Sequence, residues 1–255
     1  MLLEVKEVTK RFGGLVAVNQ VSFTVERGQV FAVVGPNGSG KTTLFNVISG
    51  VLPCSGGHVF LEGTELTGRP SYDIAKLGVG RTFQNICIFR ELSVEENVLV
   101  GRHCRTKATF LNSFFRPAWV REEEAANREK ALEMLELVGL YTRRDELAKN
   151  LAYGEQKRLE IARAMATDPQ VLLLDEPAAG LNTNEVRTLH SLIERIIGLG
   201  ITILLIEHKM DLVLRVSDRL VVLNYGRKIA EGPPGEVAKN KDVVEAYLGK
   251  SEVSA

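Results

Sequence analysis

The sequence has few features of a membrane-spanning, secreted or nucleic-acid-coating protein. Its longest apolar runs are residues 30–34, 171–174 and 201–206, and none approaches the ~20 residues that a helix needs to cross a bilayer. The first residues lack the apolar middle of a secretory signal. Lysine plus arginine and aspartate plus glutamate each total 32, so no excess positive charge would attract nucleic acid. We therefore expect no nucleic-acid partner, and any membrane role to act through a partner protein.

Cysteine is also scarce. The three cysteines, Cys54, Cys87 and Cys104, are widely spaced and form no Cys-x-x-Cys pair. This pattern argues against a disulfide framework and a zinc site, and it is typical of a reducing compartment. Of the 255 residues, 45% are hydrophobic and 25% charged, the composition of an ordinary globular protein. The length suits one large domain or two small ones that share a core.

The order of the expected strands and helices predicts an α/β core with a helical insert. The N-terminal part is mostly strand and turn, with period-two alternation at residues 21–25. Residues 121–138 and the stretch after Gly154 have helical spacing. From residue 171 onward apolar strands alternate with helices, which predicts a parallel sheet. The expected division is an α/β core with an N-terminal antiparallel β region at residues 1–86 and 166–255, and a helical subdomain at residues 87–165.

The clearest local motif is a phosphate-binding loop. Residues 35–42 read Gly-Pro-Asn-Gly-Ser-Gly-Lys-Thr and match the pattern G-x-x-x-x-G-K-[ST], between an apolar strand and an expected helix. Glycines let the backbone curl so that N–H groups face phosphate oxygens. Lys41 adds positive charge over the terminal phosphates, and Thr42 offers a hydroxyl to Mg²⁺. The predicted ATP-binding residues of this loop are Gly35, Pro36, Asn37, Gly38, Ser39, Gly40, Lys41, Thr42 and Thr43.

Two acidic residues follow the apolar strand at residues 171–174. Ligands of α/β folds bind beyond the carboxyl ends of the strands, where Asp175 and Glu176 are expected. We predict that Asp175 holds Mg²⁺, directly or through water, and that Glu176 orients or deprotonates the attacking water. Two acids after a strand are by themselves most often a solvated turn. The phosphate loop upstream favours the catalytic interpretation.

The stretch Leu-Ala-Tyr-Gly-Glu-Gln-Lys-Arg-Leu at residues 151–159 resembles the Leu-Ser-Gly-Gly-Gln signature of ABC ATPases. In that family the signature of one subunit caps the γ-phosphate that another subunit holds, by a glycine and a helix N-terminus. The resemblance implies a RecA-like P-loop NTPase core and requires that Gly154 can reach a neighbour's nucleotide. The signature residues that it implies to act in trans are Ala152, Tyr153, Gly154 and Glu155.

Further positions match the ABC family in order and spacing. Phe12 resembles the aromatic residue that stacks on adenine, although core packing would explain it equally well. Gln84 resembles the loop glutamine that senses Mg²⁺ and water and couples to the membrane partner, and His208 resembles the switch histidine at the γ-phosphate. The resemblance thus places Gln84 and His208 with Glu176 as catalytic candidates, and Gln84 with Thr42 and Asp175 as magnesium candidates. The loop that crosses the dimer interface in the family corresponds to Gly180, Leu181 and Asn182.

Several residues differ from the general ABC pattern, and the sequence around them resembles that of one ABC subgroup. Ala152 replaces a serine, Tyr153 a glycine, Glu155 a glutamine and Asn182 an aspartate. The missing serine hydroxyl would weaken γ-phosphate capture by about 1 kcal/mol. The Leu-Ala-Tyr-Gly stretch is similar to the ATP-binding subunits of branched-chain amino acid importers, the LivG type. Residues 11–18, 178–182 and 244–249 are similar to that subgroup too.

Membership of this subgroup implies Mg²⁺-dependent ATP hydrolysis coupled to uptake of branched-chain amino acids. The implied partners are a second ABC ATPase subunit, identical or merely similar, two transmembrane permease subunits and, indirectly, an extracytoplasmic solute-binding protein. The implied location is the cytoplasmic face of the inner membrane. Three alternatives remain: the motor of a related urea importer or lipopolysaccharide exporter, a non-transport ABC ATPase, and a regulatory subunit without turnover. The intact Lys41, Asp175, Glu176 and His208 argue against the last of these.

Aromatic residues gather in the expected insert, at Phe110, Phe114, Phe115 and Trp119. Such density outside a core strand suggests a contact surface. Packing of these rings onto their own helical subdomain is the favoured alternative.

Overall fold

The structure is a computed structural model, and it describes residues 1–106, 117–208 and 210–248. The expectations for Phe110, Phe114 and Phe115 lie outside these residues. Trp119 is described and belongs to helix α5 (Ala118–Leu137), where its side chain is 43% exposed. This ring is therefore not part of a core.

The N-terminal part forms the expected antiparallel sheet, with strand order β2-β1-β4-β5. Strands β1 (Leu3–Phe12) and β2 (Leu15–Val25) form a long hairpin, and β4 (Gly56–Leu61) and β5 (Thr64–Glu65) extend it beside β1. Val21, Phe23 and Val25 are buried, as their alternation predicts. Strand β1 ends at Phe12, at the turn of the hairpin, and Phe12 lies near the phosphate loop.

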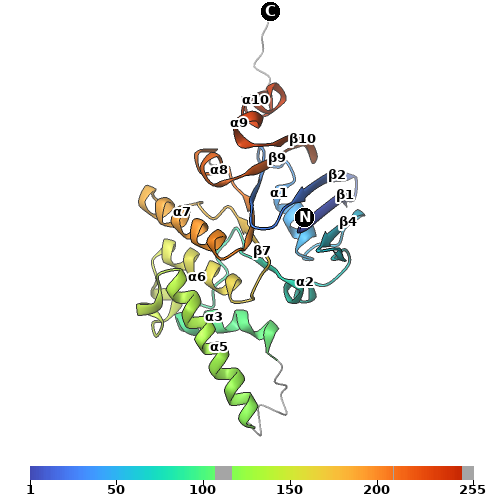
Figure 1. Cartoon of the computed structure of the whole chain (residues 1–255). Helices are drawn as coiled ribbons and strands as arrows, with labels where there is room; N and C mark the ends of the chain where they lie inside the picture. Colours follow the sequence, from blue (N-terminus) through green and yellow to red (C-terminus); the bar gives the residue numbers. More distant parts are fainter. Residues whose placement is uncertain (107–116, 209, 249–255) are drawn as a thin grey trace, which may run out of the picture.

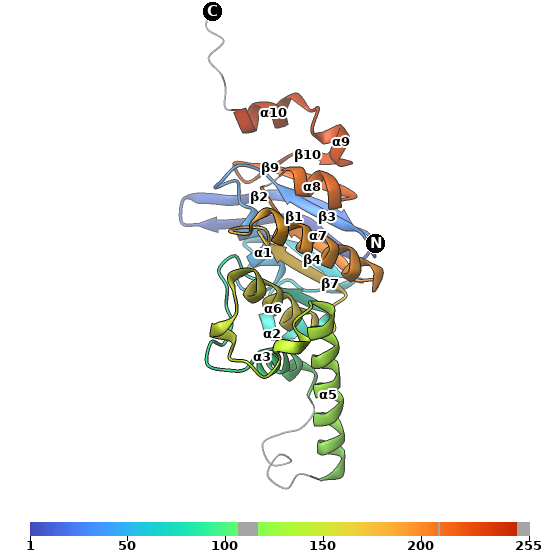
Figure 2. The ribbon, with the colours of Figure 1, turned by 90° about the vertical axis from the view of Figure 1, so that its left-hand side faces the viewer.

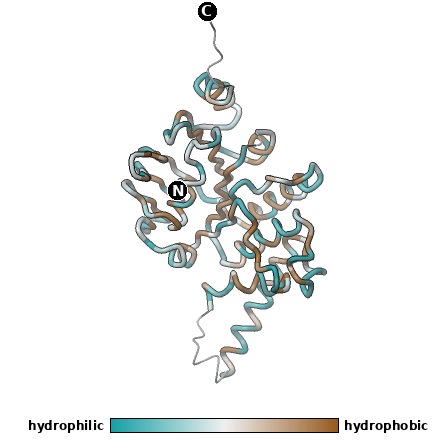
Figure 3. Tube along the Cα trace, turned by 180° about the vertical axis from the view of Figure 1, so that it is seen from behind, coloured by the Kyte–Doolittle hydropathy of each residue, from teal (hydrophilic) through white to brown (hydrophobic). Residues whose placement is uncertain are grey.

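The core sheet has strand order β10-β9-β3-β8-β7-β6. Strands β3, β6, β7, β8 and β9 are parallel, and β10 is antiparallel to β9. Every residue of β3, β7 and β8 is buried, as expected for strands covered on both faces, so the predicted parallel core is confirmed. Figure 3 shows these strands as hydrophobic segments in the middle of the molecule. Their bounds are β3 (Val30–Val34), β6 (Val79–Arg81), β7 (Val171–Asp175), β8 (Thr202–Ile206), β9 (Arg219–Asn224) and β10 (Arg227–Gly232).

Different elements cover the two faces of the core sheet. Helix α1 (Lys41–Ile48) and the antiparallel sheet pack on the face that contains Phe31 and Val33. Helices α6 (Tyr153–Met165) and α7 (Thr183–Gly198) pack on the opposite face, which contains Leu172 and Leu174. The helix expected after Gly154 thus begins one residue before it. The remaining helices of this part are α2 (Ser71–Leu77), α8 (Met210–Val216), α9 (Pro234–Val237) and α10 (Lys241–Leu248).

The chain between β6 and β7 contributes a group of helices. Helix α3 (Val94–Arg102) begins at a capping box of Ser93 and Glu96, and it packs with α5 and α6. These helices lie at one end of the molecule, and α5 projects beyond them (Figures 1 and 2). The division into a core and a helical subdomain at residues 86/87 and 165/166 stays a prediction. Short 3₁₀ turns in this part are His103–Arg105, Tyr141–Arg143 and Ala148–Asn150.

In the described ranges, the chain contains no helix that combines the length and the apolar character needed to cross a bilayer.

Candidate active site

The loop between β3 and α1 takes a shape that requires glycine. Gly35, Gly38 and Gly40 have φ angles of 148°, 78° and 102°, where other residues are strained. A Cβ atom on Gly35 would collide with the carbonyl oxygen of Leu223, and one on Gly40 with the carbonyl oxygen of Ala17. The loop therefore curls tightly against its neighbours and ends at the N-terminus of α1, where helix dipole and free N–H groups favour an anion.

The side chain of Lys41, the first residue of α1, lies inside this loop and binds its backbone. Its side chain is buried, and its Nζ donates hydrogen bonds to the carbonyl oxygens of Gly35 at 2.8 Å and Pro36 at 3.0 Å. Burial lowers the pKa of the Lys41 ammonium, while the carboxylates of Glu176 and Asp175 oppose that shift. The lysine thus places a positive charge inside the loop, and its role as a phosphate-binding group stays a prediction.

Asp175 ends strand β7 and is almost fully buried, with 1% of its side chain exposed. Its Oδ2 accepts a hydrogen bond from Nη2 of Arg81 at 3.2 Å, while burial raises the pKa of the carboxyl and Arg81 opposes this. Its Oδ1 is buried and has no hydrogen-bond partner within the described ranges. A buried carboxylate oxygen without a partner fits a bound Mg²⁺ or a water on that ion.

The other predicted magnesium residues also fit this interpretation. Thr42 and Gln84 line the cavity beside the phosphate loop and offer a hydroxyl and an amide oxygen, ligands that Mg²⁺ prefers. Residues 1–106, 117–208 and 210–248 contain no group of three or more His, Cys, Asp or Glu side chains that could hold a metal. A magnesium ion here would take most of its ligands from phosphate and water, as Mg²⁺ bound with a nucleotide does.

Glu176 is the point at which the predicted catalytic residues meet. Its Oε2 accepts a 3.1 Å hydrogen bond from Nε2 of Gln84 and lies 3.8 Å from Nδ1 of His208. The Glu176 backbone has a φ of 48°, in the left-handed region that costs a non-glycine residue about 1 kcal/mol or more. Its N–H donates to the carbonyl oxygen of Ile206, so the strand pairing continues into this residue. Such local strain is typical of functional sites.

One cavity joins these groups to the phosphate loop. Residues 35–43 all line it, together with Gln84, Glu176 and His208. Phe12 lies on its wall and is 45% exposed, with Nζ of Lys10 5.0 Å from the ring centroid. The exposed Leu15 and the partly buried Ala17 line the same cavity. The core-packing interpretation of Phe12 is therefore wrong, and this wall offers an apolar surface to a flat ring such as a nucleotide base.

Tyr247 also lines this cavity, and sequence reasoning did not single it out. It is carried by α10, and its phenol lies at the backbone amide of Gly35, which counteracts the rise in its pKa caused by burial. The only signal in the sequence was the subgroup resemblance of residues 244–249. No motif indicated that the C-terminal helix reaches the phosphate loop.

The signature residues lie away from this cavity, at the N-terminus of α6. Ala152 and Tyr153 are exposed, but Gly154 is buried under the side chain of Glu185. The requirement that Gly154 be open to a neighbour's nucleotide is therefore not met in the single chain, because the N-terminal turn of α7 packs against the start of α6. The Glu155 carboxylate folds back to the Ala152 amide at 2.9 Å and binds Nη1 of Arg143 at 3.1 Å.

The predicted interface loop contacts the signature within the same chain. Gly180 has a φ of 77°, and the ring of Tyr153 packs on it so closely that a Cβ atom would lie 2.9 Å from Tyr153 Cε1. Asn182 is the N-cap of α7, and its Oδ1 accepts from the amides of Asn184 and Glu185 at 3.0 Å each. Asparagine thus performs the capping role here that aspartate would perform. Leu181 lies between them, partly buried on the α6–α7 core.

Known proteins are similar in sequence to this chain over almost its whole length. Residues 18–179 match the ABC transporter family, and residues 227–253 match the family described as branched-chain amino acid ATP-binding cassette transporter. The high-affinity branched-chain amino acid transport ATP-binding protein BraF of Pseudomonas aeruginosa is 46% identical over 251 residues, which are 98% of each chain. LivG of Escherichia coli, a protein of the same description, is 43% identical over 98% of each chain.

Solved structures agree. The ADP conformation of MJ1267, an ATP-binding cassette of an ABC transporter, is 37% identical and has a TM-score of 0.85 over 98% of this chain and 99% of that one. The dimeric cassette MJ0796, at 24% identity and a TM-score of 0.77 over 91% and 99%, has the same fold. Sequence and structure together show that the chain belongs to the ATP-binding subunits of the ABC transporter family.

Proposed function

We propose that this chain hydrolyses ATP to drive the import of branched-chain amino acids through partner permeases. The observation that supports this most directly is the meeting of Gln84, Glu176 and His208 at one carboxylate oxygen beside the phosphate loop. A loop that only bound nucleotide would not need this arrangement. The alternative of a regulatory subunit without turnover is accordingly disfavoured.

Each part of the cavity has a defined task in this proposal. The loop amides and Lys41 bind the phosphates, and Phe12 packs on the base. Asp175 and Thr42 would hold Mg²⁺, which would offset the charge that develops on the transferred phosphoryl group. Glu176 orients the attacking water and accepts its proton, while Gln84 and His208 fix the carboxylate. Positioning and electrostatics supply most of the rate gain, since phosphoryl transfer needs little covalent help.

A second ABC subunit, identical or similar, completes each site. The signature of one chain is distant from its own cavity, and Ala152 and Tyr153 are exposed at the N-terminus of α6, which favours an anion. The ATP of one subunit would lie against the signature of the other. Glu185 must then leave Gly154 before that glycine can approach a γ-phosphate.

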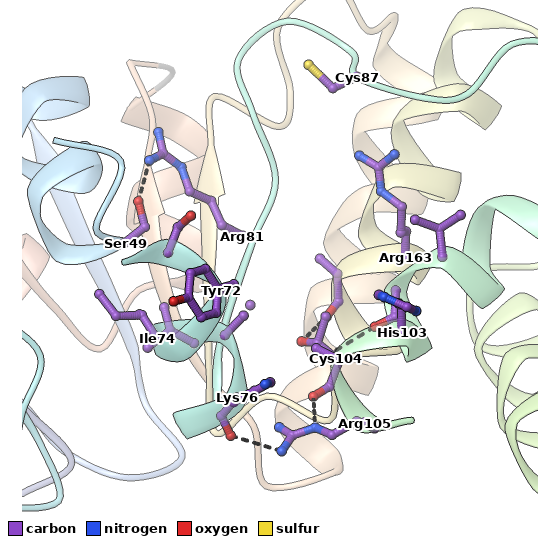
Figure 4. Close-up of a pocket in the computed structure, with 18 of the residues that line it drawn as sticks. Ser49, Tyr72, Ile74, Lys76, Arg81, Cys87, His103, Cys104, Arg105 and Arg163 are labelled. Atoms are coloured by element: carbon purple, nitrogen blue, oxygen red, sulfur yellow. Dashed lines mark hydrogen bonds between the residues drawn. The ribbon is translucent and has the colours of Figure 1, made fainter. Parts of the chain in front are cut away.

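We infer that a groove between the two parts of the chain receives the permease. It is lined by exposed rings such as Phe83 and Phe89, and Figure 4 shows its walls, with Tyr72 and Arg81 on one and His103 and Arg163 on the other. Among the described residues that line it, no aspartate or glutamate occurs. A cytoplasmic permease segment with apolar and acidic side chains fits this chemistry. The cations of this basic groove are Lys76, Arg81, Arg105 and Arg163.

The cargo is inferred from relatives. BraF and LivG are branched-chain amino acid transport proteins, and the C-terminal family match at residues 227–253 has the same description. An extracytoplasmic solute-binding protein would deliver the cargo to the permeases, with this chain at the cytoplasmic face of the inner membrane. Urea import and lipopolysaccharide export remain the alternatives within transport.

Reconstitution tests this proposal. The chain, its partner ATPase and the two permeases are placed in vesicles, and uptake of radiolabelled leucine is measured with and without ATP. Uptake should require ATP and stop with Glu176→Gln. ATP-driven uptake of urea in place of leucine, or ATP hydrolysis that no permease or cargo stimulates, would contradict the proposed cargo or the proposed coupling respectively.

A further inference from the structure

Two buried charged side chains on α6 hold the loop that carries Gln84. Oε1 of Glu160 accepts a 3.1 Å hydrogen bond from the backbone N–H of Phe83. Nζ of Lys157 donates a 3.0 Å hydrogen bond to the carbonyl oxygen of Gln84. Glu160 is 1% exposed and Lys157 4% exposed. Because residues three apart lie on one helix face, a single side of α6 holds the backbone on both sides of the Phe83–Gln84 peptide.

Burial of the Glu160 carboxylate carries a desolvation cost. Burial raises the pKa of the Glu160 carboxyl, which the charges of Lys157 and Arg163 counteract. The Cys87 amide also favours the charged form, yet Oε2 has no hydrogen-bond partner of standard geometry in the part of the chain that the structure describes. A well-packed apolar residue would avoid the cost of burying this charge. What the carboxylate adds is a fixed position for the loop.

The same helix reaches the signature. Gly154 and Glu160 are six residues apart on α6, a separation of ~9 Å along a rigid helix. On its other side the loop faces the basic groove, which Phe83, Cys87 and Phe89 help to line. Figure 4 shows Cys87 on this loop across from Arg163 of α6. The loop therefore contacts the helix that carries the signature and, like that helix, lines the groove.

We propose that Glu160, assisted by Lys157, is a positioning residue that ties the Gln84 loop to the signature helix. When a permease segment in the basic groove displaces this loop, Gln84 moves. The attachment then moves α6 as well, and Gly154 moves with α6. This inference rests on the proposed function, because the moving segment belongs to the permease. Glu160 touches no nucleotide and acts only through the loop and the helix.

Hydrogen exchange of the isolated chain tests the attachment. Glu160→Ala should speed exchange of the Phe83 amide about tenfold, since its acceptor is gone. Glu160→Gln should retain protection, because the amide oxygen still accepts. Glu95→Ala is the matched control: Glu95 is likewise a buried acid of this helical region, but it pairs with Arg128. Unchanged Phe83 exchange in Glu160→Ala would overturn the attachment.

ATPase measurements in the assembled transporter test the coupling. Glu160→Ala should bind ATP with unchanged affinity, since the phosphate loop is untouched, but lose about tenfold in kcat and in its stimulation by cargo. Glu160→Gln should recover much of both, and Glu95→Ala should match the wild type. Faster Phe83 exchange with wild-type stimulation would overturn the coupling and leave the proposed function standing. Absent stimulation in the wild-type complex would instead remove the proposed function and the coupling with it.

Discussion

Nε2 of Gln84 donates a 3.1 Å hydrogen bond to Oε2 of Glu176, across 92 positions of sequence. Gln84 belongs to a loop that lines the basic groove, and Glu176 directly follows strand β7 and lines the cavity of the phosphate loop. Any movement of that loop therefore acts on the carboxylate that the proposed reaction uses. His208 lies 3.8 Å from the same oxygen and shares this dependence.

The bond predicts that substitutions at the two residues will not be additive. Glu176→Gln should bind ATP normally and lose hydrolysis by at least about a hundredfold, because a proton acceptor is removed. Gln84→Ala alone should cost less, and the double variant should be no slower than Glu176→Gln. Steady-state ATPase rates of the assembled transporter, with nucleotide affinity measured by calorimetry, check this. Independent, multiplying effects would show that the Gln84–Glu176 bond has no role in turnover.

Lys41 predicts a dependence of nucleotide affinity on pH. Burial lowers its pKa, so its proton leaves at a lower pH than that of an ordinary lysine. Affinity for ATP should therefore fall as the pH rises from about 7 to about 10, and Lys41→Ala should bind weakly at every pH without this slope. The free energy of unfolding should contain an opposite contribution, because the unfolded chain binds the proton more tightly and stability then rises with pH. Calorimetric titrations at several pH values measure the first effect, and an equal slope in Lys41→Ala would exclude Lys41 as its source.

The shape of the phosphate loop gives a test with a matched control. Gly40 has a φ of 102°, and a Cβ atom on it would meet the backbone oxygen of Ala17. Gly40→Ala should lower the free energy of unfolding by about 1 kcal/mol or more and weaken ATP binding. Gly14→Ala, in the nearby hairpin, should lower neither, since no atom beyond its chain neighbours lies within 4 Å of the added methyl group. Thermal unfolding with and without ATP distinguishes the two variants.

The sequence predicted those features of the fold and the site that depend on residues close together in the chain. The phosphate loop and the Asp175–Glu176 pair are fixed by neighbours in the chain, and alternation and apolar runs indicated both sheets. Contacts made by separate elements left no such pattern: Tyr247 at the phosphate loop, and Glu160 at the Gln84 loop. Glu160 reads as one polar position of an amphipathic helix. Its burial depends on where the loop after β6 packs, which no short motif encodes.

The packing of the Glu185 side chain on Gly154 also joins two separate elements, so no short motif indicated it. Glu185 belongs to the capping box of α7, with its Oε2 accepting from the Asn182 amide at 2.9 Å, and the rest of its side chain lies on Gly154. Glu185→Ala would uncover the glycine and remove a negative charge from the place where a γ-phosphate must arrive. Loss of the capping bond should cost about 1 kcal/mol of stability.

In a Glu176→Gln background, Glu185→Ala should therefore increase the fraction of dimer formed at a given ATP concentration. Glu185→Gln keeps the volume and the capping oxygen but not the charge, so it separates repulsion from steric cover. A gain in both variants identifies charge as the obstacle, and a gain in alanine alone identifies the side chain itself. Analytical ultracentrifugation with ATP measures the dimer directly. Reduced assembly in Glu185→Ala would mean that this glutamate supports the interface and does not obstruct it.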